Sequence, residues 1–225
     1  MTKPIPPVVF LDMDQTIVAG NSARMYAKAM WRAGKISLFD LFKVFYFFIK
    51  YRLALIDMMA ATEKIIREMK GMSEATLRRR CEEIFEREMH TQIYPEAVAV
   101  IDEARQAGSR VVILTASSNY MVEPLARHLE ITEYLCTWTN AEEGILTGTY
   151  EAPVCFGEGK LFWARDYCSK HGFDLADCAF YTDSYTDLPV LLEVAEPVVV
   201  NPDPRLALHA RNQGWDVRQF RIPSE

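Results

Sequence analysis

The stretch that decides the fold is VVFLDMDQT, residues 8–16, near the start of the chain. It is an apolar run of strand length that ends in two carboxylates, Asp12 and Asp14, followed by the small hydroxyl residue Thr16. Because side chains alternate along an extended segment, Asp12 and Asp14 should lie on one side of it. Two like charges at such a short distance are costly unless a cation lies between them or one carboxyl group holds a proton. The pair therefore suits a Mg²⁺-assisted reaction with one carboxylate as nucleophile and the other as proton carrier, although an Asp pair after a strand can also merely cap a turn.

Length and composition restrict the class of protein. With 225 residues, the chain is long enough for one ordinary domain plus an insert, or for two small domains. It is 50% hydrophobic and 25% charged, as globular rather than disordered proteins are. A net charge of -6 argues against nucleic acid as a partner, because binding a phosphate backbone requires a basic surface. A small anionic substrate is compatible with this net charge, since a local site can be cationic within an acidic protein.

The cysteines and the N-terminus favour a cytoplasmic location. The five cysteines are scattered and contain no CxxC pair, which favours reduced thiols over a disulfide framework or a zinc knuckle. Residues 1–7 are interrupted by Pro4, Pro6 and Pro7, so we expect no signal peptide.

One segment, ISLFDLFKVFYFFI at residues 36–49, is strongly apolar and aromatic. It contains Asp40 and Lys43 and is too short to cross a bilayer, so we expect no membrane span. Its helical spacing favours a buried helix in a small helical domain. A dimer surface or an interfacial contact is the alternative, so the sequence allows a monomer or a homodimer.

The rest of the chain alternates between strand and helix patterns. Apolar, β-branched runs predict buried parallel strands at residues 8–11, 110–114, 178–182 and 197–200. Helical patterns lie at residues 94–107, 119–129, 160–171 and 187–194. This alternation predicts an α/β fold with a doubly wound, mostly parallel sheet. Glu143 and Gly144, between short alternating segments, predict a β-hairpin over 137–150.

Residues 20–91 do not follow this alternation. They contain no strand pattern and predict helices at 22–33, 38–55, 58–69 and 73–89. We therefore expect an α/β core formed by residues 1–19 and 92–225, with residues 20–91 inserted after the first strand as a helical cap above its carboxyl end.

Polar residues follow each predicted strand. The second strand leads into residues 115–118, TASS, and the third into Asp183 and Asp187, while a GEGK loop ending at Lys160 lies between them. Ligands of open α/β sheets bind beyond the carboxyl ends of the strands, so these groups should converge. Each has an ordinary structural reading alone, as a helix cap, a surface lysine or a helix N-terminal charge. Their order and context together make coincidence improbable.

With these motifs the chain resembles the haloacid dehalogenase superfamily. The Asp-x-Asp-x-Thr pattern of that family is present at residues 12–16, its strand-end hydroxyl at Thr115, its lysine at Lys160, and its Asp-x-x-x-Asp at Asp183 and Asp187. The helical insert resembles the cap of the phosphoserine-phosphatase-like branch. The segments TDSYTDLP, residues 182–189, and VNPD, residues 200–203, are similar to a bacterial sub-branch of it.

The resemblance implies a role for each carboxylate. Asp12 would attack phosphorus and form an aspartyl-phosphate, and Asp14 would protonate the leaving oxygen and later deprotonate the attacking water. Mg²⁺ would be held by the side chains of Asp12 and Asp183 and by the backbone carbonyl of Asp14. Asp187 would hold a metal-bound water or orient the lysine.

The resemblance also implies a phosphate-binding set. Lys160 and the Thr115 hydroxyl would neutralise the phosphoryl oxygens, with the backbone N–H groups of Met13, Asp14 and Ala116. The lysine would let the anionic nucleophile approach an anionic phosphate.

Together these observations predict a Mg²⁺-dependent phosphatase that acts on a small phosphorylated metabolite, because a closing cap leaves little room for a macromolecule. A phosphotransferase that uses the same intermediate, and a phosphoserine phosphatase proper, are the alternatives. The alternative of another class is a binding protein that keeps the fold without catalysis.

Asn21 bears on the choice of substrate. Phosphoserine phosphatases of the resembling family carry a glutamate nine residues after the nucleophile, and it pairs with the substrate's ammonium. Asn21 occupies that position here, and an amide supplies no charge-assisted hydrogen bond. Asn21 can equally cap the first cap helix. We therefore expect L-phosphoserine to be a poor substrate.

Overall fold

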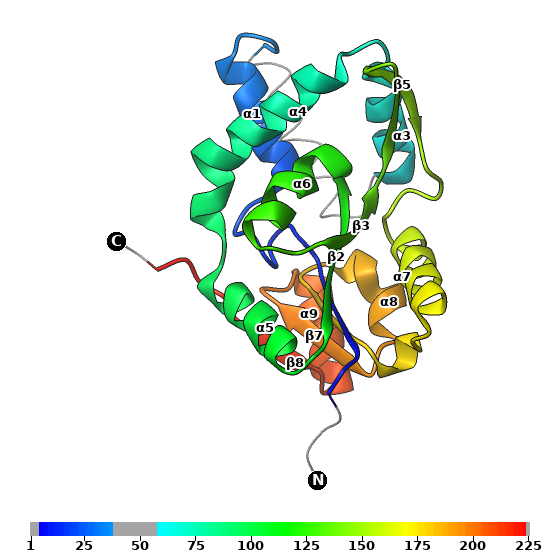
Figure 1. The fold of residues 1–225 in the computed structure, drawn as a ribbon. Coiled ribbons are helices and arrows are strands. Elements are labelled where there is room, and N and C mark those ends of the chain that lie inside the picture. Colours follow the sequence, from blue (N-terminus) through cyan, green and yellow to red (C-terminus); the bar gives the residue numbers. More distant parts are fainter. Residues whose placement is uncertain (1–4, 38–57, 224–225) are drawn as a thin grey trace.

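In the computed structural model, which describes residues 5–37 and 58–223, strand β1 (Val8–Leu11) lies inside a six-stranded sheet (Figure 1). The sheet order is β3-β2-β1-β6-β7-β8, and every neighbouring pair is parallel. The other strands are β2 (Arg110–Ser118), β3 (Glu133–Thr137), β6 (Ala179–Thr182), β7 (Glu196–Val200) and β8 (Asp216–Arg218). The predicted α/β fold with a doubly wound parallel sheet is confirmed.

Helices cover both faces of the sheet because β1 alternates between them. Val9 and Leu11 face one hydrophobic cluster, which includes α5 (Pro95–Gln106) and α6 (Asn119–His128). Val8 and Phe10 face a second cluster. This second cluster includes α7 (Glu158–His171), α8 (Leu188–Leu191) and α9 (Pro204–Gln213). A strand buried on both faces needs the continuous apolar run that β1 has.

The site-forming position in this sheet is the gap between β1 and β6. From β1 the chain adds β2 and β3 on one side, and it then returns to add β6, β7 and β8 on the other. The carboxyl ends of the two strands at such a switch point border a crevice. Leu11 pairs with Tyr181, and the Asp12 N–H donates to the Tyr181 carbonyl at 2.9 Å. Asp12 and the loop after β6 are thereby brought to the same edge.

Further helices lie beyond the carboxyl ends of the strands (Figure 1). They are α1 (Ser22–Arg32), α3 (Met58–Glu68) and α4 (Glu74–Ile84), which continues through a π-helical turn (Phe85–Met89) and a 3₁₀ turn (His90–Gln92). Asn21 and Ser73 cap α1 and α4 with their side chains. The helix predicted over 38–55, and with it most of segment 36–49, lies outside the described residues.

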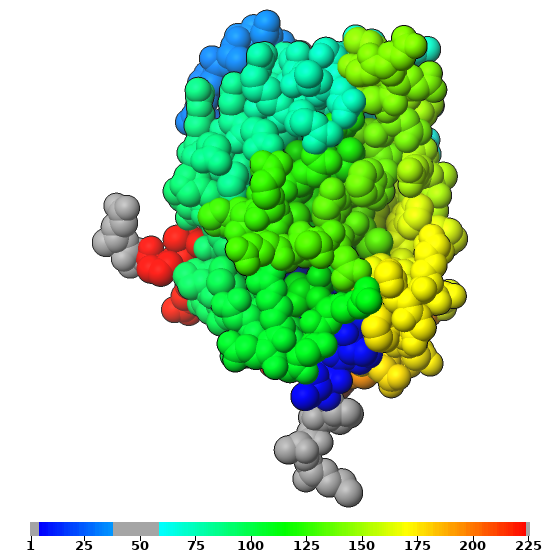
Figure 2. All heavy atoms as spheres, viewed as in Figure 1, coloured from blue at the N-terminus to red at the C-terminus, as the bar shows by residue number. Residues whose placement is uncertain are grey.

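The predicted hairpin is present as β4 (Thr139–Glu142) and β5 (Ile145–Tyr150), and its tip is bound to this helical segment. The Glu74 N–H donates to the Gly144 carbonyl at 2.8 Å, and Leu146 exchanges backbone hydrogen bonds of 2.9 Å with residues 71 and 72. In the space-filling view the yellow-green hairpin abuts the cyan helical segment (Figure 2). The hairpin therefore ties the helices to the sheet-bearing part of the chain.

Several elements differ from the prediction. β2 continues past Leu114 to Ser118, with a register shift against β3. The helix predicted over 187–194 is a 3₁₀ turn (Tyr185–Asp187) followed by the short α8, which ends at Leu191, and residues 192–195 turn into β7. The strands β3 and β8 were not predicted, since these edge strands are partly exposed and lack a long apolar run. None of the helices in the described residues is long and apolar enough to span a membrane.

Gly159 allows the start of α7 to approach the preceding loop closely. A Cβ atom at this position would lie 1.9 Å from the Val154 carbonyl oxygen, so Gly159→Ala must displace the first turn of α7. We expect a loss of about 2–3 kcal/mol in the free energy of unfolding, measured by urea denaturation. Gly172→Ala is the matched control at the other end of α7, where the φ of 74° is strained for alanine but no atom is close. It should lose only about 1 kcal/mol, and equal losses for the two variants would contradict the steric argument.

Candidate active site

The side chain of Lys160 joins two distant parts of the sequence. Its Nζ donates to Asp12 Oδ1 at 2.8 Å and to Asp187 Oδ2 at 2.7 Å. All three side chains are buried: Lys160 is only 3% exposed, and the carboxylates are similarly enclosed. Asp12 follows β1, Asp187 ends the loop after β6, and Lys160 lies in the first turn of α7. Three of the predicted catalytic motifs thus converge at the switch point.

The charge of Lys160 is maintained by its partners. Burial by itself would lower the pKa of the amine, but the carboxylates of Asp12 and Asp187 raise it above its ordinary value. Thr182, at the end of β6, donates its hydroxyl to the same Asp187 oxygen at 2.6 Å. Asp187 therefore has one oxygen held by both Thr182 and Lys160, which orients the ammonium toward Asp12.

The carboxyl group of Asp14 lies at the N-terminus of α1. Oδ1 accepts the Ser22 N–H at 2.9 Å, and Oδ2 accepts the Ser22 hydroxyl at 2.9 Å and the Asn21 amide at 3.2 Å. The positive end of a helix stabilises a carboxylate there. Asn21 Oδ1 also accepts the Arg24 N–H at 3.1 Å, so this side chain caps the helix. Sequence reasoning missed Ser22, because a serine in the first turn of a helix is too common to be a signal.

Burial raises the pKa values of both aspartates of the opening motif. The pKa of Asp14 rises to about 7, because burial and the charge of Asp12 outweigh the Ser22 hydrogen bonds. Burial also raises the pKa of Asp12, while the Lys160 ammonium acts in the opposite direction. A carboxyl group that titrates near neutrality can both give and take a proton. Asp14 is therefore suited to proton transfer, and Asp12, paired with an ammonium, is suited to act as an anion.

The carboxylates of this edge repel one another. Burial and the charges of Asp12 and Asp187 raise the pKa of Asp183 well above its usual range. Oxygen ligands with excess negative charge are what Mg²⁺ binds. In the described part of the chain, no three or more His, Cys, Asp or Glu side chains are grouped to hold a metal ion. A Mg²⁺ site of two carboxylates, a backbone carbonyl and waters does not require such a group, so the donor set fits Mg²⁺.

The predicted phosphate-binding residues lie at the adjoining strand end. Thr115 is buried. It follows Ile113 by two residues, and Ile113 pairs with Leu11, so Thr115 lies beside the end of β1 that leads into Asp12. Its hydroxyl accepts the Ser117 N–H at 3.3 Å. Ala116 is exposed, and its carbonyl accepts the Thr137 hydroxyl at 3.0 Å. Met13 is buried, and its carbonyl accepts the N–H groups of residues 17 and 18 in the tight turn after β1.

The segment Val200-Asn201-Pro202-Asp203 supports the loop that carries Asp183. The Asp203 N–H donates to the Asp183 carbonyl at 2.9 Å, and the Asp203 carboxylate accepts the Tyr185 N–H at 2.6 Å. The same carboxylate caps α9. The motif therefore fixes the acidic loop from its outer side.

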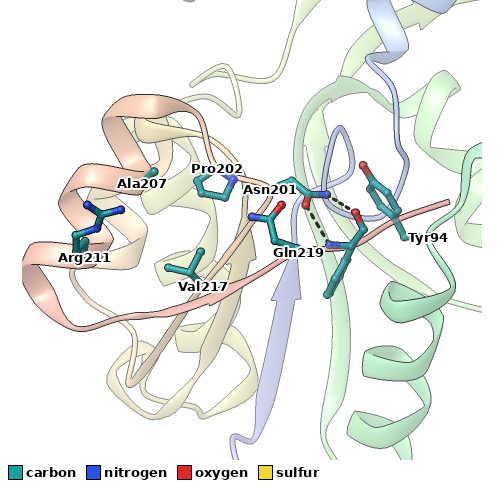
Figure 3. Close-up of a pocket in the computed structure, with 8 residues that line it drawn as sticks. Tyr94, Asn201, Pro202, Ala207, Arg211, Val217 and Gln219 are labelled. Atoms are coloured by element: carbon teal, nitrogen blue, oxygen red, sulfur yellow. Dashed lines mark hydrogen bonds between the residues drawn. The ribbon is translucent and has the colours of Figure 1, made fainter.

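Asn201 has a separate role beside a surface groove of about 690 Å³ (Figure 3). Its amide exchanges two hydrogen bonds, of 3.2 and 3.0 Å, with the backbone of Phe220, which fixes the C-terminal segment. The groove is lined by Tyr94, Asn201, Pro202, Ala207, Arg211, Val217, Gln219 and Phe220. None of these is a predicted catalytic residue, so this groove is distinct from the converging side chains at the switch point.

Comparison with known proteins identifies the family of this chain. The sequence matches the haloacid dehalogenase-like hydrolase family over residues 9–192. A phosphoserine phosphatase of Mycobacterium tuberculosis is 30% identical over 226 residues, covering 96% of this chain and 73% of that protein. A protein of unknown function from Bordetella pertussis Tohama I has the same fold, with a TM-score of 0.82 and 25% identity over 93% of this chain and 96% of that chain.

A phospho-aspartyl intermediate analogue of a phosphoserine phosphatase matches with a TM-score of 0.70, covering 95% of this chain and 93% of that chain. At 16% identity this likeness shows the fold alone. The chain belongs to the haloacid dehalogenase-like hydrolase family, and it is a hydrolase of the phosphatase type.

Proposed function

We propose that the protein is a Mg²⁺-dependent phosphatase that hydrolyses a small phosphomonoester through an aspartyl-phosphate on Asp12. The observation that carries this proposal is the buried Asp12–Lys160–Asp187 contact with the Asp14 carboxyl group beside it. It provides an anionic nucleophile, a fixed cation and a group that titrates near neutrality at one strand edge.

In the first half-reaction a carboxylate oxygen of Asp12 attacks phosphorus. The bond from phosphorus to the ester oxygen breaks, its electron pair stays on that oxygen, and Asp14 gives the oxygen a proton. Lys160 lowers the repulsion between the carboxylate and the phosphate. The Thr115 hydroxyl, together with the backbone N–H groups of the phosphate-binding set, donates to the phosphoryl oxygens. The other members of this set are Met13, Asp14 and Ala116.

In the second half-reaction water attacks the phosphorus of the aspartyl-phosphate. Asp14, now a carboxylate, takes a proton from this water as the new bond forms. The bond between phosphorus and the Asp12 oxygen breaks, which regenerates the Asp12 carboxylate and releases inorganic phosphate. One group thus serves as acid and then as base.

Mg²⁺ supplies neutralisation of the phosphoryl charge when it is bound. The side chains of Asp12 and Asp183 and the backbone carbonyl of Asp14 would hold it. The repulsion between the buried carboxylates supports this assignment, because a bound cation would relieve it. Asp187 acts through Lys160, or through a metal-bound water. The loop that carries Asp183 is held by two hydrogen bonds: the Asp203 N–H donates to the Asp183 carbonyl, and the Asp203 carboxylate accepts the Tyr185 N–H.

We assign residues 20–91 as a cap and residues 1–19 and 92–225 as the catalytic core. In support, α1, α3 and α4 lie beyond the carboxyl ends of the strands, and the hairpin ties them to the core (Figure 1). A covered site favours a small phosphorylated metabolite over a macromolecule. The free, buried cysteines support a cytoplasmic location.

A phosphotransferase would use the same residues and pass the phosphoryl group to an alcohol instead of water. Release of inorganic phosphate in the absence of an acceptor alcohol distinguishes the hydrolase from this alternative.

Asp12→Asn tests the nucleophile. The amide keeps the shape of the side chain but cannot attack phosphorus, so we expect kcat to fall by about a thousandfold or more while the circular dichroism spectrum is unchanged. Asp102→Asn, an exposed aspartate on α5, is the matched control and should keep full activity. Phosphatase activity of the purified Asp12→Asn protein above a trace would refute the covalent route.

Metal dependence is tested by chelation and by two aspartate variants. EDTA should abolish activity, and added Mg²⁺ should restore it. Asp183→Ala removes a proposed direct ligand, so it should raise the dissociation constant for Mg²⁺, measured by calorimetry, by about 100-fold or more, beyond the loss typical of a residue that only orients a ligand. Asp187→Ala should raise it less, because Asp187 contacts Lys160. Activity that persists at full level with the chelator would contradict the metal site.

Substrate preference is tested at Asn21. Because Asn21 lacks a charge and is engaged with Asp14 and Arg24, we expect kcat/KM for L-phosphoserine to be below that for glycerol 2-phosphate, an alkyl phosphate whose alcohol part carries no charge. The quantity to compare is kcat/KM for L-phosphoserine divided by kcat/KM for glycerol 2-phosphate. We expect this ratio to be about tenfold higher for Asn21→Glu than for Asn21→Gln, a control whose side chain has the same length but no charge. The expectation fails if phosphoserine is the better substrate of the wild-type protein or if Glu and Gln give the same ratio.

A further inference from the structure

Ser22 links the helical segment to two parts of the active site. It is the first residue of α1, is 3% exposed, and contacts Asp14 through both its N–H and its hydroxyl. The same hydroxyl lies 2.6 Å from the hydroxyl of Ser117, near the end of β2. One small side chain therefore connects the start of α1, the motif after β1 and the end of β2.

The hydrogen bonds to Asp14 are not shared equally between its two oxygens. Oδ2 accepts two donors, the Ser22 hydroxyl and the Asn21 amide, so both of its lone pairs are occupied. Oδ1 accepts only the Ser22 N–H among the described residues, which leaves one lone pair for a proton. The contacts thus distinguish the two oxygens.

We propose that Ser22 is a positioning residue for proton transfer, which holds Asp14 so that Oδ1 is the oxygen that gives and takes the proton. This inference rests on the proposed function of Asp14. During ester cleavage the proton on Oδ1 moves to the ester oxygen as the bond to phosphorus breaks. During hydrolysis Oδ1 takes a proton from water as the water oxygen bonds to phosphorus and the bond from phosphorus to the Asp12 oxygen breaks.

Ser117 fixes the Ser22 hydroxyl in turn. A hydroxyl has one proton to donate, and Ser22 gives it to Asp14, so at the 2.6 Å contact the Ser117 hydroxyl is the donor. This orients Ser22 from the end of β2. Proton transfer by Asp14 therefore requires the start of α1 to lie against that strand.

The test uses the leaving group of the substrate. An alkoxide leaves only with a proton, whereas p-nitrophenolate leaves without one. In single-turnover experiments, Ser22→Ala should slow ester cleavage of glycerol 2-phosphate about tenfold or more and that of p-nitrophenyl phosphate less than about threefold, with KM nearly unchanged. Ser73→Ala removes a hydroxyl from the cap position of another helix, α4, and should change neither rate.

Two further variants separate the possible failures. Asp14→Asn should show the same preference for the good leaving group, only more strongly. If it does and Ser22→Ala slows both esters equally or neither, the inference about Ser22 is wrong while the proposed function stands. If Asp14→Asn itself treats both esters alike, the role of Asp14 as proton carrier is overturned.

Ser117→Ala tests the second link and keeps the question answerable if Ser22→Ala does not fold. It should show a smaller loss with the same dependence on the leaving group. The double variant Ser22→Ala, Ser117→Ala should cleave glycerol 2-phosphate less than about twofold more slowly than Ser22→Ala alone, because Ser117 acts through Ser22. Independent, multiplying losses would overturn this link.

Discussion

The ammonium group of Lys160 lies between the carboxylates of Asp12 and Asp187, and the arrangement of the sheet edge depends on this contact. Removing one partner of a buried ion pair costs about 3–5 kcal/mol, because the other charge is left unpaired. The three residues come from β1, the first turn of α7 and the loop after β6. The same interaction therefore holds these elements together and stabilises the charge of Asp12, the proposed nucleophile.

The backbone around this contact is built to bring the lysine close. Gly159 passes so near the Val154 carbonyl that no side chain fits, and Lys160 follows it directly. The ammonium of Lys160 lies over the ring of Phe180 on β6, with 5.7 Å between Nζ and the ring centre. On the other side, Asp203 holds the loop of Asp183 by two hydrogen bonds. The charged groups thus have fixed positions before substrate arrives, which is what electrostatic stabilisation of a transition state requires.

The sequence predicted the centre of the molecule better than its edges. β1 and β6 were predicted correctly, because a strand buried on both faces has a continuous apolar run. The edge strands β3 and β8 lack such runs. The helix α9 was also missed, although Asp203, Pro204 and Gly214 are ordinary start and stop signals for a helix.

The candidate site shows the same division. The contact of Lys160 with Asp12 could be expected from motif order, since parallel strands end at one edge. The contacts of Ser22 could not, because they depend on how α1 begins after the turn and on Ser117, 95 residues away. Asn21 could be read as a cap or as a substrate contact, and its bond to the Arg24 N–H shows that it caps α1.

The central claim is that Asp12 carries the phosphoryl group, and a crystal structure grown with Mg²⁺ and beryllium fluoride tests it most directly. Beryllium fluoride mimics a phosphoryl group on a carboxylate. We expect beryllium bonded to a carboxylate oxygen of Asp12, with Lys160 and Thr115 contacting its fluorides. Beryllium bonded to Asp14, Asp183 or any other residue, or an unmodified Asp12 under saturating conditions, would contradict the account.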